Sequence, residues 1–280
     1  MRCLITDITG TLGQAVTKIL LEEGHEVTGY SRDELKQSQL PFVSKVTLYL
    51  GDIRDKERLV EASRGKDIIF HFAALKRVDA LQENPEEAYK TNVLGTDNVL
   101  HAQRHNGIPR VVLSSTDKAA YPINVYGCTK QIAESLVLRN PNNVVCRYGN
   151  VLASRGSAVP VFVDAIKRGK PVPITDTRMT RFFIRIEDAA KFVVASSMGV
   201  TGGLKIPPMR GCKMTSVASA IALLLGHEYS LRDVGCRPGE KLAECLRMEH
   251  EGGAVFSDNA EQYTESELIE LIRPIVGEFV

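Results

Sequence analysis

Residues 4–13 read LITDITGTLG, a short apolar run that leads into a loop with glycines at positions 10 and 13. A stretch with helical periodicity follows, from Leu12 to Glu23. This strand, loop and helix are the context that a dinucleotide requires, because the backbone approaches the pyrophosphate at glycine and the helix N-terminus offers N–H groups to the anion. We therefore expect the cofactor to be bound by Thr9, Gly10, Thr11, Leu12 and Gly13.

The loop departs from the usual pattern at one position. Its spacing fits Gly-x-x-Gly-x-x-Gly, but Asp7 stands where the first glycine is expected. Aspartate tolerates a left-handed backbone better than most residues, so we expect the turn to form. The carboxylate would repel a nearby phosphate unless it caps the helix or points away, so Asp7 bears on cofactor affinity.

Apolar runs typical of strands continue outward from this loop, and helical stretches separate them. Short strands that alternate with helices indicate βαβ units on a parallel sheet, which is an α/β fold. After Asn150 prolines punctuate shorter elements, so we expect a cofactor domain over 1–150 with a return segment near 186–207, and a substrate lobe over 151–185 and 208–280. The predicted strands lie near 4–5, 26–30, 46–50, 67–72, 110–114 and 143–147, and the predicted helices over 12–23, 54–62, 86–104 and 125–138.

The composition of the 280 residues is that of an ordinary globular protein, with 44% hydrophobic residues and 35 Lys+Arg against 34 Asp+Glu. This balance argues against a nucleic-acid binder. The longest uncharged apolar stretch, Met214–Gly226, is too short to span a membrane, and the N-terminus lacks a signal pattern, so we expect a cytoplasmic protein. The six cysteines are far apart and have no metal-ligand spacing, so we expect reduced, mostly buried thiols and no metal.

The end of the second predicted strand bears on cofactor choice. An NAD enzyme usually has a carboxylate there for the ribose 2′-hydroxyl, whereas this chain has Ser31 and Arg32, which suit a 2′-phosphate. NADP is therefore expected and NAD is the weaker fit, although a solvated charge cluster is the alternative. After the third strand, Asp52 and Ile53 could hold the adenine.

Tyr126 and Lys130 are the candidate catalytic pair. A Tyr-x-x-x-Lys spacing places both side chains on one helix face, about 5 to 6 Å apart at Cβ. A cation about 4 Å from a phenolate contributes up to ~4 kcal/mol at an effective dielectric of ~20, so Lys130 is expected to lower the pKa of Tyr126 toward neutrality. By itself this pattern also occurs by chance on many helices.

The chain resembles the extended short-chain dehydrogenase/reductases that act on nucleotide sugars. More narrowly, it is similar to the soluble inverting UDP-N-acetylglucosamine 4,6-dehydratases of pseudaminic acid and capsule biosynthesis. These have a Rossmann-type doubly wound parallel sheet with a smaller C-terminal substrate-binding lobe. The matching stretches are 30–36, 51–55, 73–76, 90–96, 115–119, 124–127, 147–151, 154–157, 175–182 and 237–241.

The resemblance implies a mechanism without net redox change. Tyr126, assisted by Lys130, takes the 4-hydroxyl proton while hydride passes from C4 to NADP. Asp117 protonates the departing 6-hydroxyl, and Lys118 removes and redelivers the C5 proton, which implies inversion at C5. For Asp117 and Lys118 the alternative is a strand-end turn with a surface lysine.

The resemblance also implies ligand contacts and assembly. The substrate would be a UDP-sugar. The protein is expected to form a homo-oligomer, a dimer or higher. Each of the arginines in the substrate set below could instead belong to a structural ion pair. The further cofactor residues implied are Lys36, Ala73, Ala74, Lys76, Asn92 and Val151, together with Tyr126 and Lys130, and the substrate residues implied are Lys76, Thr116, Asn150, Arg155, Thr180, Arg181, Arg237 and Glu240.

Two other functions remain open from the sequence. A C4-epimerase or reductase of a nucleotide sugar would use Tyr126 and Lys130 but has no need of the Asp117 and Lys118 pair. A nucleotide-sensing protein without turnover is suggested by Asp7 alone. Such proteins commonly lose Tyr or Lys of the active pair, and both are present here.

Overall fold

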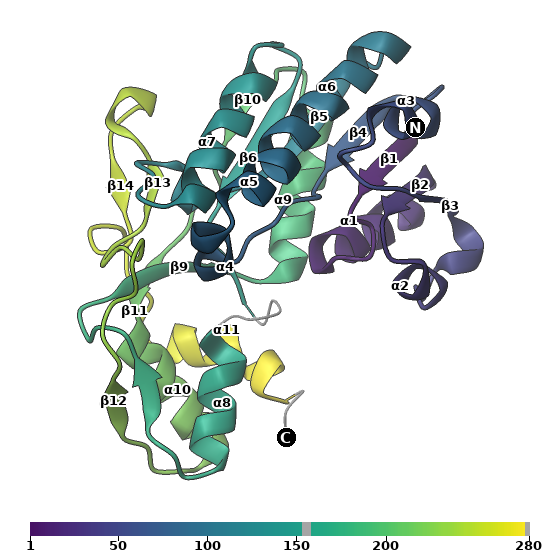
Figure 1. Cartoon of the computed structure of the whole chain (residues 1–280). Coiled ribbons are helices and arrows are strands. Elements are labelled where there is room, and N and C mark those ends of the chain that lie inside the picture. The colour runs from purple at the N-terminus through teal and green to yellow at the C-terminus, as the bar shows by residue number, and fades with distance from the viewer. Residues whose placement is uncertain (153–157, 278–280) are drawn as a thin grey trace. The chain divides into compact units, whose positions relative to one another are not determined.

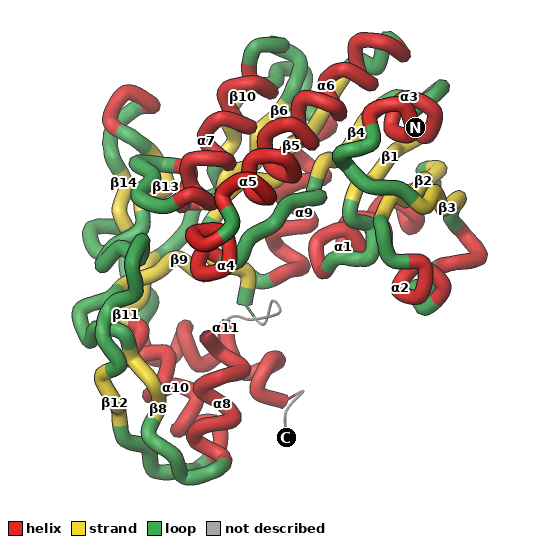
Figure 2. Tube along the Cα trace, viewed as in Figure 1, coloured by secondary structure: helices red, strands yellow, loops and turns green. Residues whose placement is uncertain are grey.

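The computed structural model describes residues 1–152 and 158–277, so Arg155 lies outside the described residues. The chain divides into two compact units, Met1–Arg147 with Ile186–Pro207 (unit 1) and Tyr148–Arg185 with Pro208–Val280 (unit 2). Figures 1 and 2 show the elements of each unit.

Unit 1 is built on a seven-stranded sheet with the order β10-β6-β5-β4-β1-β2-β3. Neighbouring strands from β3 across to β5 pair in parallel, as do β6 and β10. This order reverses beside β1, as it does in a doubly wound sheet. The predicted Rossmann-type α/β fold is therefore confirmed. The strands are β1 (Arg2–Thr6), β2 (Glu26–Ser31), β3 (Thr47–Leu50), β4 (Ile68–His71), β5 (Arg110–Thr116), β6 (Val144–Tyr148) and β10 (Gly203–Lys205).

Helices cover both faces of this sheet (Figure 1). Helices α3, α6 and α7 pack side by side on one face, and α1 packs with α9 on the other. The inner strands β1, β2, β4, β5 and β6 are consequently buried almost throughout, since a parallel sheet is covered on both sides, whereas the edge strands β3 and β10 are partly exposed. The helices are α1 (Thr11–Glu22), α2 (Glu34–Ser38), α3 (Lys56–Ala62), α4 (Val78–Glu83), α5 (Pro85–Ala88), α6 (Gly95–Asn106), α7 (Val125–Leu138) and α9 (Ile186–Met198).

The carboxyl ends of the central strands lie in register. Thr6 of β1 pairs with His71 of β4, which pairs with Leu113 of β5. The loops that follow these strands therefore start at the same edge of the sheet, where ligands of open α/β sheets bind.

One predicted helix is wrong in its interior. The segment 86–104 was expected to be a single helix, but a π-helical turn, η2 (Tyr89–Leu94), separates α5 from α6. The periodicity of apolar residues does not reveal such a turn, because it shifts the helix face by only one residue. The turn carries Asn92, one of the predicted cofactor residues.

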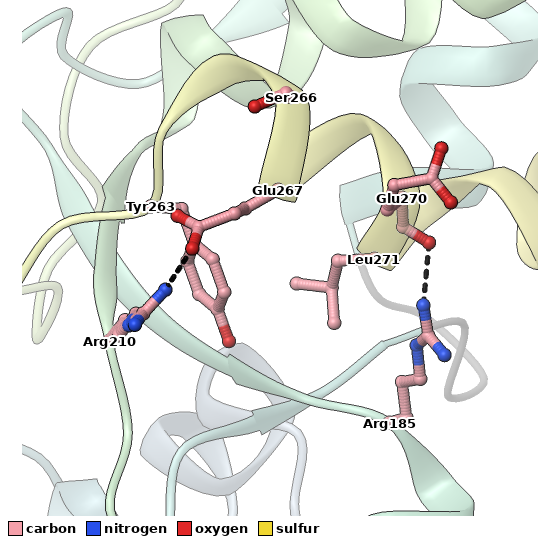
Figure 3. Close-up of a pocket in the computed structure, with 7 residues that line it drawn as sticks. All are labelled: Arg185, Arg210, Tyr263, Ser266, Glu267, Glu270 and Leu271. Atoms are coloured by element: carbon pink, nitrogen blue, oxygen red, sulfur yellow. Dashed lines mark hydrogen bonds and ion pairs between the residues drawn. The ribbon is translucent and has the colours of Figure 1, made fainter.

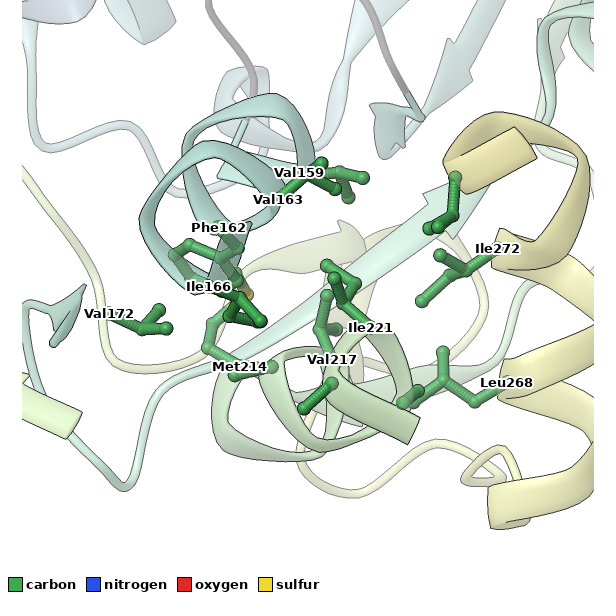
Figure 4. Close-up of a cluster of buried hydrophobic side chains, with 14 of the residues drawn as sticks. Val159, Phe162, Val163, Ile166, Val172, Met214, Val217, Ile221, Leu268 and Ile272 are labelled. Atoms are coloured by element: carbon green, nitrogen blue, oxygen red, sulfur yellow. The ribbon is translucent and has the colours of Figure 1, made fainter. Parts of the chain in front are cut away.

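Unit 2 has its own hydrophobic core, which Figure 4 shows. Val159, Phe162 and Ile166 of α8 meet Val217 and Ile221 of α10 and two side chains of α11 in this cluster. Its elements are β7 (Asn150–Val151), α8 (Ala158–Lys167), β8 (Val172–Ile174), β9 (Thr180–Ile184), β11 (Gly211–Lys213), α10 (Met214–Leu225), β12 (Leu231–Asp233), β13 (Cys245–Arg247), β14 (Val255–Phe256) and α11 (Glu265–Gly277).

The cysteines agree with the sequence-based expectation. All six are free thiols, and four of them, Cys3, Cys146, Cys212 and Cys245, are buried. Within the described residues, no helix combines the length and the apolar character needed to cross a membrane.

The core of unit 2 generates a test of stability. Ile221 is fully buried, whereas Leu223 on the same helix is 59% exposed. We expect Ile221→Ala to lower the free energy of unfolding by about 2–5 kcal/mol, because it removes buried methyl groups and leaves a cavity. Leu223→Ala is the matched control and should change it by less than about 0.5 kcal/mol in denaturant titrations.

Candidate active site

The predicted phosphate loop follows β1 and has the geometry that its glycines allow. Asp7 adopts a left-handed backbone with φ of 57°. Its N–H donates to the Tyr30 carbonyl at 2.8 Å, and its own carbonyl accepts from Gly10 N at 2.9 Å. A Cβ atom on Gly13 would lie 2.3 Å from that same carbonyl oxygen, so the first turn of α1 packs directly on the loop backbone.

The Asp7 side chain lies over the loop. A Cβ atom on Gly10 would be 2.3 Å from Oδ2 of Asp7, so the carboxylate lies against the residue that caps the N-terminus of α1. The turn therefore forms with aspartate at the first position, as expected. Its negative charge therefore lies beside Gly10, at the start of the helix whose N-terminus a pyrophosphate would use.

The residues predicted for the adenosine end differ in availability. Arg32 is 57% exposed, and its Nη1 lies 3.7 Å from Oδ2 of Asp52. Arg54 donates to the same carboxylate through Nε and Nη2 and holds its pKa below the usual range. Lys36 forms an ion pair of 2.6 Å with Asp33, so Arg32 is the more accessible cation.

Ser31 and Ile53 are built into the protein interior. Gln37 donates from Nε2 to the hydroxyl of Ser31 at 2.9 Å and to its carbonyl at 3.1 Å. Ile53 is 4% exposed and contacts the helix at Gly95, where a Cβ would be 2.9 Å from its Cγ2. Ile53 thus packs in the core of unit 1, which limits what it can offer an adenine ring.

Asn92 ties the segment after β4 to the helix of the candidate catalytic pair. Its Oδ1 accepts from Leu75 N at 2.8 Å, and its Nδ2 donates to Leu75 O and to Oγ1 of Thr129. Thr129 precedes Lys130 on α7. Asn92 therefore positions residues 73–76, which include the predicted Ala73, Ala74 and Lys76.

His71 belongs to the same edge and was not singled out from the sequence. Oγ1 of Thr6 accepts from two backbone N–H groups, of Phe72 and Ala73, so its hydrogen is directed to Nδ1 of His71 at 3.0 Å. Nε2 of His71 then donates to Oγ1 of Thr96 at 3.1 Å. Burial lowers the pKa of His71 to about 3, so this relay holds a neutral imidazole.

The backbone at the catalytic candidates Asp117 and Lys118 packs closely against Gly127 of α7. They form a short turn (Asp117–Ala119) directly after β5, and a Cβ atom on Gly127 would lie 2.3 Å from the Lys118 carbonyl oxygen. Only glycine allows this close approach. The helix begins beside it, where Oδ1 of Asn124 accepts from Gly127 N at 2.8 Å.

Unit 1 brings together Thr116 and all four predicted catalytic residues. Nζ of Lys118 lies 2.9 Å from Oδ1 of Asp117, which also accepts from the Thr116 hydroxyl at 3.0 Å. The pKa of Tyr126 responds to the Thr116 side chain and the charge of Lys118, which lower it, and to the charge of Asp117, which raises it. Lys130 donates from Nζ to the Ser114 carbonyl at 2.8 Å.

The predicted effect of Lys130 on the pKa of Tyr126 is wrong. Burial raises the pKa of Tyr126 to about 12, and the cation that opposes this rise is Lys118. Burial also lowers the pKa of Lys130 to about 8. The desolvation of both groups therefore outweighs their expected mutual attraction.

In unit 2, Thr180 and Arg181 contribute to a buried network. Arg181 donates from Nη1 to the carbonyls of Thr180 and Leu242, and its Nε lies 4.0 Å from Glu244. These contacts agree with a structural ion pair, which is the alternative to substrate binding for Arg181. Contacts of Arg181 with substrate stay a prediction.

The other predicted unit 2 residues lie on a strand and a loop. Asn150 and Val151 form β7, which pairs with β9. Glu240 accepts from the backbone N–H of Arg237 at 3.1 Å, while the Arg237 side chain lies on an exposed part of the loop. The geometry leaves the Arg237 guanidinium accessible to an anion, and Glu240 shapes the loop that presents it.

A pocket of about 350 Å³ lies beside α11 in unit 2 (Figure 3). Its two arginines have protein partners: Arg210 pairs with Glu267 at 2.5 Å and with Glu261 at 2.9 Å, and Arg185 donates to the Glu270 carbonyl. This pocket includes none of the predicted site residues.

Comparison with known proteins agrees with the motifs. The family model described as "polysaccharide biosynthesis protein" matches residues 3–265. The chain belongs to this family. It is 43% identical over 259 residues to a UDP-N-acetylglucosamine 4,6-dehydratase (inverting) of Campylobacter jejuni, covering 87% of this chain and 76% of that protein. It is 38% identical over 260 residues to a UDP-glucose 4-epimerase of Rickettsia typhi, with the same coverage.

Solved structures share the fold. Pen from Bacillus thuringiensis superposes with a TM-score of 0.90 at 29% identity, covering 97% of this chain and 96% of that one. DesIV, a dTDP-glucose 4,6-dehydratase of Streptomyces venezuelae, gives a TM-score of 0.80 at 22% identity, covering 98% and 96%, which bears on the fold alone. The resemblance to nucleotide-sugar short-chain dehydrogenase/reductases is thus confirmed.

The position of Asp7 predicts an effect on cofactor affinity. Asp7→Asn removes the charge, and asparagine tolerates the left-handed backbone, so we expect a nicotinamide dinucleotide to bind about tenfold more tightly or better. Asp7→Gly should act in the same direction. Isothermal titration with NADP and with NAD measures the affinity of both variants, and an unchanged affinity would show that the carboxylate does not face the pyrophosphate.

Proposed function

We propose that this protein is an NADP-dependent UDP-N-acetylglucosamine 4,6-dehydratase that yields a 4-keto-6-deoxy sugar with inverted C5. The observation that carries the proposal is the ion pair of Asp117 and Lys118 placed beside Tyr126. A simple epimerase has no need of this second acid/base pair. The 43% identity to a dehydratase of the inverting type supports the same activity.

The residues present fit a dinucleotide. The loop after β1 presents the N-terminus of a 12-residue helix, and Arg32 offers an accessible guanidinium at the end of β2. Asp7 is the feature that opposes tight binding. When bound, NADP would accept hydride from C4 and return it to C6.

Tyr126 serves as the base for the 4-hydroxyl in this proposal. Burial makes its phenol a weak acid, so the phenolate is a strong base once formed. The Thr116 side chain and the charge of Lys118 both favour the phenolate. These two effects partly offset the rise that burial causes in the pKa of Tyr126.

Asp117 and Lys118 serve the elimination. A proton that moves along the 2.9 Å contact from Nζ of Lys118 to Oδ1 of Asp117 produces a neutral carboxylic acid and a neutral amine. The amine can then take the C5 proton, which the 4-ketone has acidified, and the acid can protonate the departing 6-hydroxyl. C5 is inverted when its new proton arrives on the face opposite to the one that lost the first proton, and the proposal assigns this delivery to Lys118.

The direct test is incubation with UDP-N-acetylglucosamine and NADP in deuterated water. We expect a product that has lost one water and carries deuterium at C5, seen by mass spectrometry and proton NMR. Lys118→Met should reduce dehydration at least ~100-fold because it removes the base. Lys118→Arg is the matched variant that keeps the charge but cannot give up its proton, so it should be equally inactive.

A C4-epimerase is the second candidate, because a UDP-glucose 4-epimerase is 38% identical. It predicts UDP-N-acetylgalactosamine, or UDP-galactose from UDP-glucose, with no loss of water. Lys118→Met would then leave most of the turnover. Appearance of the epimer without deuterium at C5 would overturn the dehydratase proposal.

Cofactor preference is tested at Arg32. We expect Arg32→Ala to weaken NADP binding about tenfold or more, since it removes the accessible cation at the 2′-phosphate position. NAD binding should hardly change. Lys36→Ala is the control, because Lys36 is already paired with Asp33 and should have the smaller effect on NADP.

The remaining ligand contacts are part of the same proposal. Asn150, Arg155, Arg181, Arg237 and Glu240 would contact the UDP part, with Arg237 the accessible guanidinium among the described arginines of this set. A homo-oligomer in the cytoplasm is likewise proposed from the family resemblance.

A further inference from the structure

Three buried polar side chains form a network behind the candidate catalytic pair. Glu134 of α7 accepts from the Ser115 hydroxyl of β5 at 2.5 Å and from Nε of Arg147 at the end of β6 at 3.0 Å. Nη2 of Arg147 lies 2.6 Å from the other carboxylate oxygen of Glu134. Arg147 is 1% exposed and Glu134 is 3% exposed, so this fork-to-fork ion pair is shielded from water.

The network adjoins Lys130 from two directions. Tyr126, Lys130 and Glu134 follow one another at intervals of four residues, so they share one face of α7. On β5, the Ser114 carbonyl accepts a hydrogen bond from the amine of Lys130, and the hydroxyl of Ser115 donates one to Glu134. Glu134 is thus the next side chain after Lys130 along this face of the helix. Its carboxylate also binds Ser115, the residue next to the carbonyl group that accepts from Lys130.

The negative charge of Glu134 affects the pKa of the buried amine of Lys130. Burial lowers the pKa of Lys130, and Glu134 is the charged group that raises it again. Among the described residues, His71 of β4 interacts with the charge of Lys130 and is neutral, the Ser114 carbonyl of β5 accepts from its amine, and Tyr126 shares its helix face. None of these carries an opposing negative charge in the resting state.

We propose that Glu134 is a positioning residue that keeps the amine of Lys130 charged at neutral pH and in place against the Ser114 carbonyl. Arg147 and Ser115 hold the Glu134 carboxylate in position for this role. The importance of Glu134 for turnover rests on the proposed function, in which Lys130 assists Tyr126. The effect on the charge of Lys130 does not depend on the substrate. A buried pair that only stabilised the fold would leave the titration of Lys130 unchanged.

The test is a titration of Lys130 in the whole protein labelled with ε-¹³C-lysine. Its NMR resonance is identified by its absence in Lys130→Met. We expect a midpoint near pH 8 in the unmodified protein. In Glu134→Gln the midpoint should fall by about one pH unit or more, because the neighbouring negative charge is lost and the Arg147 cation is left.

Two further variants keep the test falsifiable if Glu134→Gln does not fold. The double variant Glu134→Gln with Arg147→Met replaces the ion pair by neutral groups of similar size, which buried sites tolerate. Its midpoint should lie between that of Glu134→Gln and that of the unmodified protein. Arg147→Lys keeps both charges and should leave the midpoint near its original value.

The pH dependence of turnover gives the second readout. The alkaline limb of kcat for UDP-N-acetylglucosamine dehydration should move to lower pH in Glu134→Gln and in the double variant, in step with the NMR midpoint. A folded Glu134→Gln variant, or a folded double variant, whose Lys130 midpoint equals that of the unmodified protein would overturn the inference. A shifted midpoint in a protein that does not dehydrate the sugar would overturn the proposed function and leave this inference standing.

Discussion

The alignment of strand ends in the parallel sheet is the constraint on which unit 1 depends. Thr6, His71 and Leu113 pair across β1, β4 and β5, so the loops after these strands begin at one edge. The hydrogen bonds from Thr6 to His71 and from His71 to Thr96 secure that alignment away from water. The phosphate loop, the segment held by Asn92 and the Asp117 turn all start from this edge, although about a hundred residues separate the first from the last.

Desolvation shapes the chemistry at this edge more than pairwise attraction does. Burial raises the pKa of Tyr126 and lowers those of Lys130 and His71, so each charged form is disfavoured. Charges that persist have a partner, which for Lys118 is its neighbour Asp117 in the same turn and for Glu134 is Arg147 from β6. Acid, base and supporting charge are therefore set by packing between α7, β5 and β6.

Much of the fold could be predicted because its signals are local. The alternation of apolar runs with helical stretches located β1 to β6, and the helix predicted over 125–138 has the same bounds as α7. The π-turn that carries Asn92 was missed, since it changes the backbone without changing the apolar pattern. In the site, the Tyr126 and Lys130 spacing and the Asp117 and Lys118 pair were recognisable from motifs. Glu134 follows Lys130 at the same helical spacing and could have been noticed, but its partner Arg147 could not be paired with it from sequence.

The sequence by itself determined the class of fold, the cofactor loop and the set of reactive side chains, because these follow from periodicity and from spacing along single elements. Only the tertiary structure decided which of those side chains share an environment and in what ionisation state. It placed Asp7 against Gly10, engaged Arg181 in a buried network and made burial dominate the pKa of Tyr126. The physical reason is that desolvation and ion pairing depend on residues from different elements, whose proximity is created only when the sheet and its helices pack.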